Sequence, residues 1–437
     1  MIRDDSVSGA SLQASQHRDG ERYRYVVAVV LALVYMLNFL DRQILSILAE
    51  PIKLELGLSD TQLGLLTGLT FALFYALFGI PVALIADRWN RVRVIAAACS
   101  LWSLFTAASG FAGSFLSLAL ARVGVGIGEA GCSPPAYSIL SDYFPPERRG
   151  RALGIYVLGV PAGSLIGTVA AAWIAAHYGW RAAFISVGLL GLLAAPLILL
   201  LIREPQRGRY DAGGRAQPPG AALDAFRFFF RSPALVLNAI ASGLTAFVSY
   251  GIINWTPAFL TRVQGMTLPQ IGTYYGLVLA GSMVVASWLG AVFSDRLGAR
   301  NAVYYPLLPG LGLVFMIPLL IGFTLASSWQ MSLLLMIIPV VLTSTYLVPA
   351  LALLQNRTPA RYRATASSLL LFLINLTGLG CGPLLVGAIS DWLAPVYGDR
   401  SLVYALQCLI PFALLAFAFQ CASAWAIRKE SRAVSTG

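Results

Sequence analysis

The sequence has few charged residues for its length. Only 11% of its 437 residues are Asp, Glu, Lys or Arg, and 58% are hydrophobic, whereas about 25% of a typical soluble domain is charged. Its two histidines and five cysteines form no metal-binding pattern, no disulfide framework and no nucleophile beside a base. We therefore expect neither an enzyme nor a bound cofactor or metal, but a membrane protein.

The net charge of +11 could suggest a nucleic-acid partner. Its distribution argues against one, because the basic residues fall in short loops between apolar runs, as the positive-inside rule describes. The alternate loops carry only Lys53, Arg181, Arg262 and Arg400. We expect no nucleic acid, and we expect both termini on the cytoplasmic side of a cell membrane. Arginine greatly outnumbers lysine, which is typical of a GC-rich bacterial genome, so we expect a bacterial inner membrane.

Apolar runs recur along the whole chain, and each is close to the roughly 20 residues that cross a bilayer as a helix. A β-barrel would instead show alternating segments of about 10 residues. The pattern predicts an all-α polytopic membrane protein with twelve transmembrane helices. The predicted spans are residues 25–49, 61–86, 92–112, 115–140, 150–176, 181–202, 233–260, 269–294, 301–326, 329–356, 364–390 and 401–427.

One long polar connection divides the spans into two blocks of six. Residues 203–232 contain Gly-Gly-Arg and Gln-Pro-Pro-Gly, which is typical of a flexible linker. Residues 1–24 are polar, without the short apolar core of a signal sequence, and we expect a mobile tail there. The predicted organisation is a cytoplasmic tail (1–24), a six-helix bundle (25–202), a cytoplasmic linker (203–232), a second six-helix bundle (233–427) and a cytoplasmic tail (428–437).

The two blocks share short motifs at corresponding positions. Asp87-Arg88 follows the second span of the first block, and Asp295-Arg296 follows the second span of the second. The sequence beginning at Pro145 likewise matches the sequence beginning at Pro359, at nearly the same separation. Two six-helix pseudo-repeats in parallel are the architecture of the major facilitator fold.

Four charged residues lie deep in the predicted spans. Asp41 and Arg42 are in span 1, and Arg122 and Glu129 are in span 4. Such residues usually face a bundle interior or a wet cavity. The seven-residue separation in span 4 places both side chains on one helix face, and Asp41 and Arg122 have similar predicted depths. We expect Asp41 and Glu129 to be proton-coupling groups, although a fixed ion-pair network that pins the bundle is an alternative.

Aromatic and weakly polar residues are prominent in other spans. The candidates for contact with a substrate are Arg42 and Arg122 together with Tyr75, Tyr250, Asn254, Trp255 and Tyr346. Lone aromatics on membrane helices commonly serve packing instead. The first block offers charge and the second offers apolar and weakly polar surface, a combination that suits an amphipathic anion.

Several motifs together resemble the spinster family of lysolipid and sphingosine-phosphate transporters, within the major facilitator superfamily. They are Asn38-x-x-Asp41-Arg42, Val125-Gly-Ile-Gly128-Glu129-Ala130, Val160-Pro161-Ala-Gly163-Ser164 and Arg203-Glu204-Pro205-x-Arg207-Gly208. The first half of the chain matches well, and the second half matches in hydropathy and its loop motif. The loop after span 2 departs from the superfamily pattern, since Ala83 and Asn90 replace its usual glycines.

The resemblance implies secondary transport by alternating access, with proton coupling through Asp41 and Glu129. It implies that Arg42 meets an anionic headgroup, and it adds Asn38 to the candidate substrate-binding residues. It also implies a conformational latch in which Asp87 faces a helix N-terminus and Asp142 pairs with basic residues of the loop after span 2. Those basic residues are Arg88 and Arg91.

The expected partners are the lipid bilayer, an amphipathic small molecule and protons, and we expect a monomer. A symporter of a small organic anion, a multidrug-type exporter and a channel are the alternatives.

Overall fold

The computed structural model describes residues 6–210, 222–359 and 362–435, and every regular element in these ranges is a helix. Ten helical runs are long and apolar enough to cross a membrane. Two of them, 147–201 and 365–430, contain a sharp turn at Gly179 (φ 83°) and Gly398 (φ 54°), respectively. The predicted fold of an all-helical, polytopic membrane protein is therefore confirmed.

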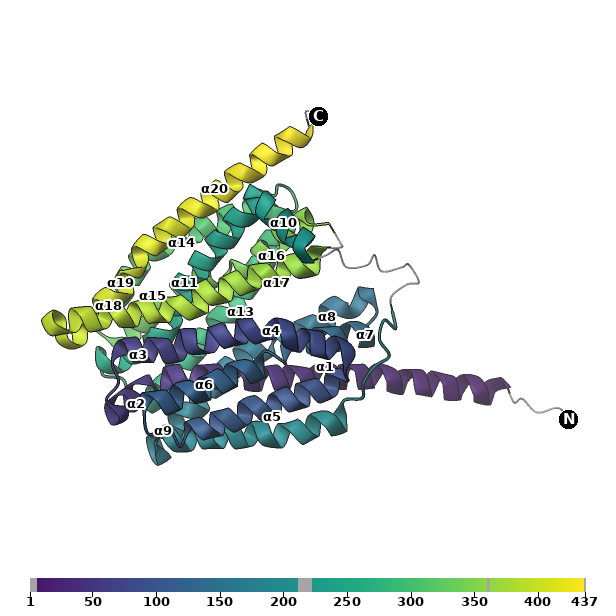
Figure 1. The fold of residues 1–437 in the computed structure, drawn as a ribbon, viewed down its shortest axis with the longest axis horizontal. Helices are drawn as coiled ribbons and strands as arrows, with labels where there is room; N and C mark the ends of the chain where they lie inside the picture. The colour runs from purple at the N-terminus through teal and green to yellow at the C-terminus, as the bar shows by residue number, and fades with distance from the viewer. Residues whose placement is uncertain (1–5, 211–221, 360–361, 436–437) are drawn as a thin grey trace.

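The helices form two groups that follow one another along the chain (Figure 1). The first group comprises α1 (Ser6–Ile47), α2 (Ala49–Leu56), α3 (Asp60–Gly64), the π-helical η1 (Leu65–Leu69), α4 (Thr70–Arg88), α5 (Arg91–Ser109), α6 (Phe115–Glu129), α7 (Ser133–Tyr143), α8 (Pro146–Val157) and α9 (Gly159–Leu201). The second comprises α10 (Ala222–Arg231), α11 (Pro233–Arg262), α12 (Leu268–Gln270), η2 (Ile271–Tyr275), α13 (Gly276–Phe293), η3 (Ser294–Gly298), α14 (Tyr304–Leu325), α15 (Trp329–Ser344), α16 (Leu347–Arg357), α17 (Arg363–Ile374), η5 (Asn375–Cys381), α18 (Gly382–Tyr397), η6 (Gly398–Arg400), α19 (Ser401–Gln407) and α20 (Leu409–Ser435).

The ends of the helices form two opposite faces of the molecule. The terminal face, where α1 begins and α20 ends, carries the loops 88–91, 143–146 and 203–210 (Figure 1). The opposite face carries the segments 47–60 and 397–401.

Serine residues mark the start of four helices. The side chains of Ser59, Ser114, Ser232 and Ser328 each accept a hydrogen bond from a backbone N–H in the following first turn. A serine in this position satisfies one of the four N–H groups that a helix leaves unpaired at its start. These caps place the helix starts within a few residues of the starts predicted from hydropathy.

Spans 4 and 10 differ from the prediction because each consists of two helices. Span 4 breaks between α6 and α7, where Pro134 and Pro135 occupy the first turn of α7. Span 10 breaks between α15 and α16, and Pro349 has no N–H to donate to the carbonyl of Thr345. Interrupted helices at matching positions of two repeats are a feature of transporter binding sites.

The N-terminal segment also differs from the prediction. α1 begins at Ser6, so the helix extends into the polar segment that was expected to be a tail, and no proline interrupts it. At its other end α1 stops at Ile47, and the short helix α2 follows. Pro51 explains the break, because it cannot donate a hydrogen bond to the Ile47 carbonyl and its ring crowds that carbonyl.

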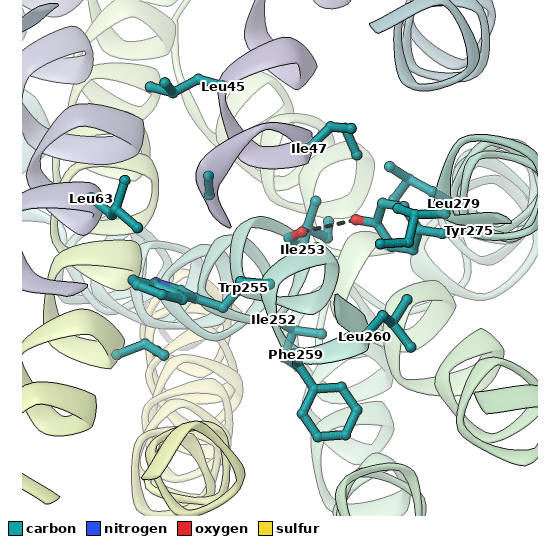
Figure 2. Close-up of a cluster of buried hydrophobic side chains, with 14 of the residues drawn as sticks. Leu45, Ile47, Leu63, Ile252, Ile253, Trp255, Phe259, Leu260, Tyr275 and Leu279 are labelled. Carbon is teal, nitrogen blue, oxygen red and sulfur yellow. Dashed lines mark hydrogen bonds between the residues drawn. The ribbon is translucent and has the colours of Figure 1, made fainter. Parts of the chain in front are cut away.

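An apolar cluster joins the two helix groups near the opposite face (Figure 2). Leu45 of α1 and Leu63 of α3 belong to the same cluster as Trp255 and Phe259 of α11, and all four are buried. These buried side chains fill the space between the helices of the two groups at close-packed density. The two groups are therefore packed together at this end of the molecule.

Candidate functional site

A cavity of about 290 Å³ lies between the two helix groups, and both groups line it. Five of the predicted substrate-binding residues are among its lining residues: Arg42, Arg122, Tyr250, Asn254 and Tyr346. Residues that the sequence analysis did not single out also line it, including Tyr35, Phe39, Gln43, Tyr137, Met283 and Ser344. Tyr35, Phe39 and Arg42 follow the four- and three-residue spacing of one helix face, and this spacing was a signal available in the sequence.

Arg42 lies in the cavity wall with its carboxylate partner behind it. Its Nε donates to Glu129 Oε2 over 2.7 Å, and the side chain of Glu129 is fully buried while that of Arg42 is 16% exposed. The Arg42 guanidinium carbon also lies 4.9 Å from the ring centroid of Phe71 and 4.8 Å from that of Tyr75. Aromatic faces attract a cation, so this arrangement keeps the guanidinium at the cavity surface.

Asp41 and Arg122 form a second pair, deeper in the first helix group. Arg122 Nη1 lies 3.5 Å from Asp41 Oδ1, and both side chains are buried. The hydroxyl of Thr106 also contacts the Asp41 carboxylate. Phe71 lies near both pairs, since its ring centroid is 4.9 Å from the Arg42 guanidinium carbon and 5.1 Å from that of Arg122. Each intramembrane carboxylate thus has its own arginine.

Glycines of α6 allow these pairs to form. A Cβ on Gly126 would lie 2.8 Å from the carbonyl oxygen of Phe71, and a Cβ on Gly128 would lie 2.6 Å from the backbone nitrogen of Trp102. Real Cβ atoms do not approach so closely, so α6 packs directly on the backbones of α4 and α5. This close approach brings Arg122 and Glu129 to the partners that span 1 provides.

Several buried polar atoms beside the pairs have no hydrogen-bond partner within the described ranges. They are both amide atoms of Asn38, Nε of Arg122 and Oε1 of Glu129. Buried polar atoms are normally paired, because an unpaired one loses its contact with water without replacement. The site therefore has spare hydrogen-bonding capacity on its charged side.

The wall from the second helix group is aromatic and weakly polar. Asn254 accepts a hydrogen bond from the Ser46 hydroxyl over 2.6 Å and donates to the Tyr250 carbonyl over 3.0 Å. The bond from Ser46 connects the two groups at the level of the cavity. Arg42 and Arg122 are the charged residues among those lining the cavity, and both belong to the first group.

Three predicted binding residues lie outside the cavity lining. Trp255 is buried, and its indole N–H donates to the carbonyl of Pro383 over 2.8 Å, which ties α11 to α18. Tyr75 lies behind the wall against Arg42 and stacks on Phe71 at 5.5 Å. Asn38, three residues before Asp41 in the sequence, is buried and does not line the cavity.

A charge network joins the two groups at the opposite face. Arg262 of α11 pairs with Glu50 of α2 and lies 2.7 Å from Asp60 of α3, and Lys53 also pairs with Asp60 over 2.5 Å. Asp391 of α18 accepts hydrogen bonds from the backbone N–H groups of Asp60 (2.9 Å) and its neighbour at the start of α3 (2.7 Å). A carboxylate at a helix N-terminus is favoured by the helix dipole. Together with the cluster in Figure 2, this network joins the two helix groups at the opposite face.

Nothing in the hydropathy pattern predicted this network. Arg262 was expected in a loop between spans, and the structure has it as the last residue of α11, outside the cavity lining. The partners of Arg262 come from α2 and α3, so hydropathy alone does not identify them.

The predicted latch residues lie at the terminal face, and one of the two expected pairs, Arg91 with Asp142, forms there. Arg91 lies 2.5 Å from Asp142 and 2.7 Å from Glu204. The second oxygen of Asp142 accepts from the N–H of Gly208 over 3.0 Å. Arg88, the other expected partner of Asp142, is instead exposed. Both oxygens of the Asp142 carboxylate are already bonded, one to Arg91 and the other to the backbone of Gly208.

The start of the expected linker takes part in this arrangement. The guanidinium of Arg207 donates to backbone carbonyls at the end of α4, including those of Ala86 (2.8 Å) and Trp89 (2.5 Å). Asp87 lies between them in the sequence, and its side chain is exposed. Residues 203–208 are therefore packed on the first helix group.

Comparisons with known proteins agree with this geometry. The family model of the Major Facilitator Superfamily matches residues 31–380. An MFS-type efflux pump of Mycolicibacterium smegmatis is 32% identical, and the match covers 90% of this chain and 90% of the pump. Human protein spinster homolog 1 is 29% identical, and the match covers 84% of this chain and 73% of that protein.

A solved structure shows the same fold. The crystal structure of a bacterial homolog to the human lysosomal transporter Spinster, in an inward-facing and unoccupied conformation, is 33% identical and superposes with a TM-score of 0.85, covering 93% of this chain and 98% of that one. With two helical groups around a central cavity, the chain belongs to the major facilitator superfamily of transporters and resembles the spinster proteins within it.

Proposed function

We propose that this transporter moves an amphipathic, lysolipid-like anion by proton-coupled alternating access. The observation that carries the proposal is the division of the cavity into two unlike walls. Arg42 and Arg122 supply positive charge from one helix group, while Tyr250 and Tyr346 supply aromatic surface from the other. A solute with an anionic head and an apolar body complements both walls at once.

The proposed coupling follows from the two carboxylate–arginine pairs. A proton on Glu129 would neutralise the partner of Arg42, and a substrate anion would then replace the carboxylate at the guanidinium. Asp41 would act in the same way on Arg122, which makes both carboxylates candidates for proton binding. A fixed ion-pair network that pins the helices is the competing role, and it predicts that transport does not respond to a pH gradient.

We propose that the terminal face is cytoplasmic and that the two bundles (25–202 and 233–427) move against each other about the cavity. The basic loops of this face support its orientation. The network around Arg262 and Asp60 would hold the opposite face closed, as in a state open toward the cytoplasm. Both tails and the linker 203–232 would then also be cytoplasmic, and one chain would suffice for the cycle.

A multidrug-type exporter is the second candidate, and the efflux pump of M. smegmatis is the relative that favours it. An apolar cation would fit the aromatic wall but would meet Arg42 at the charged wall. A small dianion is less well matched, because the described residues that line the cavity include no cation from the second helix group.

The test compares ligands at two pH values and then measures flux. Purified protein is titrated with a lysophospholipid, a small dicarboxylate and an apolar cationic dye, with binding followed by tryptophan quenching or thermal shift. The proposal expects tight, pH-dependent binding of the lysophospholipid, followed by its uptake or release in proteoliposomes when a pH gradient is imposed. Binding of the dicarboxylate alone or of the dye alone would replace the proposed substrate class. Unimpaired pH-driven flux in both Asp41→Asn and Glu129→Gln would refute the coupling.

A further inference from the structure

The short helix α10 exposes an apolar stripe at the terminal face. Leu223, Phe226 and Phe230 are 60%, 41% and 56% exposed, respectively, and their three- and four-residue spacing places them on one side of the helix. Ala225 and Phe229 point the other way and are buried. The helix is therefore packed on the protein by one side and leaves a second apolar side uncovered.

A groove of about 700 Å³ borders the same helix. Arg227 and Arg231 contribute to it from α10, and Arg357 contributes from the end of α16. Two carboxylates also line it, so three cations face two anions. Glu430 is engaged, since its oxygens lie 2.5 Å from Arg357 and 3.1 Å from the N–H of Ala234. The groove thus keeps an excess of positive charge on the side of α10.

The two arginines of α10 are weakly held. Arg227 lies 3.7 Å from Asp224, and both side chains are more than half exposed, a geometry that contributes little to stability. Arg231 is exposed, and no ion pair of its side chain occurs within the described ranges. On a helical wheel both arginines lie beside the exposed apolar stripe, on the side away from Phe229. Positive charge next to an uncovered apolar face is the pattern of a helix lying in a membrane surface.

The position of α10 limits its distance from the membrane. Only Ser232 separates the end of α10 from Pro233, the first residue of the membrane-spanning α11. A ten-residue helix is about 15 Å long, so every residue of α10 lies within roughly that distance of the point at which α11 begins. Figure 1 shows α10 at this end of the molecule, where it contacts α11 and α17.

We propose that α10 is a membrane-surface helix and that its arginines bind the headgroup of an anionic phospholipid of the surrounding bilayer. The apolar stripe enters the boundary between headgroups and acyl chains, and the lipid phosphate occupies the groove between Arg227 and Arg231. The proposal rests on the membrane-spanning fold alone, and it stands or falls independently of which solute the central cavity carries.

The first test measures the thermal stability of the full-length protein in detergent with added dioleoylphosphatidylglycerol, dioleoylphosphatidylcholine or inorganic phosphate. Phosphatidylglycerol is expected to raise the melting temperature by several degrees, and the other two additives much less. The double variant R227Q/R231Q is expected to lose more than half of this rise, and R227K/R231K to keep it. The control R93Q/R428Q removes two exposed arginines elsewhere and is expected to respond like the wild type.

Three results would overturn the proposal: an equal rise with phosphatidylcholine, an equal rise with phosphate alone, or an equal loss in the control variant. A second measurement does not depend on the arginine variants. A nitroxide label is placed at Phe230→Cys in a cysteine-free background and reconstituted into mixed phosphatidylcholine and phosphatidylglycerol liposomes. Greater collision with oxygen than with a water-soluble nickel complex is expected, and the reverse would show that α10 does not enter the membrane surface.

Discussion

Replacement of Arg262 by glutamine is expected to open the opposite face of the transporter. The Arg262 guanidinium pairs with two carboxylates of the other helix group, those of Glu50 and Asp60. The Arg262 side chain is only 9% exposed. R262Q removes the positive charge while keeping a side chain of similar length. Glu50 would then lose its cationic partner in the closed arrangement, whereas in an opened arrangement water would solvate it.

The expected size of the effect follows from the burial of these groups. Removing one partner of a buried ion pair costs about 3–5 kcal/mol. Lys53 remains on Asp60 over 2.5 Å, so the lower end of that range applies here. A change of about 3 kcal/mol corresponds to roughly a hundredfold shift in the ratio of closed to open molecules.

The assay is an electron–electron distance measurement across the opposite face. Spin labels at Leu54→Cys and Val396→Cys, in a cysteine-free background, report on the two helix groups, because both native side chains are exposed there. R262Q should move the distance distribution toward longer values. R181Q is the matched control, since Arg181 pairs with Glu55 inside the first helix group. If R262Q and the parent give the same distribution, the network does not hold this face closed.

Four further predictions concern single residues. Gly64→Ala should also shift that distribution toward longer distances, because the added methyl would lie 2.5 Å from a carbonyl oxygen of α18; an unchanged distribution would contradict the close packing. Glu129→Gln should abolish the response of flux to a pH gradient while leaving expression intact, and a full response would exclude Glu129 from coupling. Arg42→Ala should weaken binding of a lysophospholipid about 10- to 100-fold, the range for a lost charged hydrogen bond. It should weaken binding of a neutral monoacylglycerol far less, and equal losses for the two ligands would count against a headgroup contact. Hydrogen bonds from Trp180 and Arg181 hold the pKa of Glu55 below its ordinary value, so Glu55→Gln should lower the melting temperature at neutral pH. That difference should vanish as the pH falls through the folded-state pKa of Glu55, because a carboxyl with a depressed pKa stabilises the fold only while ionised; a constant difference would refute the reasoning.

Much of the architecture was determined by the sequence itself. Hydropathy predicted the twelve crossings, because each helix must satisfy its own backbone hydrogen bonds within an apolar run of fixed length. The pairing of motifs at Asp87 and Asp295 predicted two related halves. The four intramembrane charges stood out for the same reason, since a charge within such a run requires a partner or water.

The tertiary structure decided which partner each charge received. The sequence suggested that Asp41 and Arg122 could meet, but the bond from Arg42 to Glu129 depends on how α6 packs against α1 and α4. Residues that bring the two halves together are far apart in the chain: Arg262 meets Asp60 only because α11 ends, and α3 begins, at the same face. Local pattern fixes where a helix runs, whereas contacts between helices depend on the packing of many side chains at once.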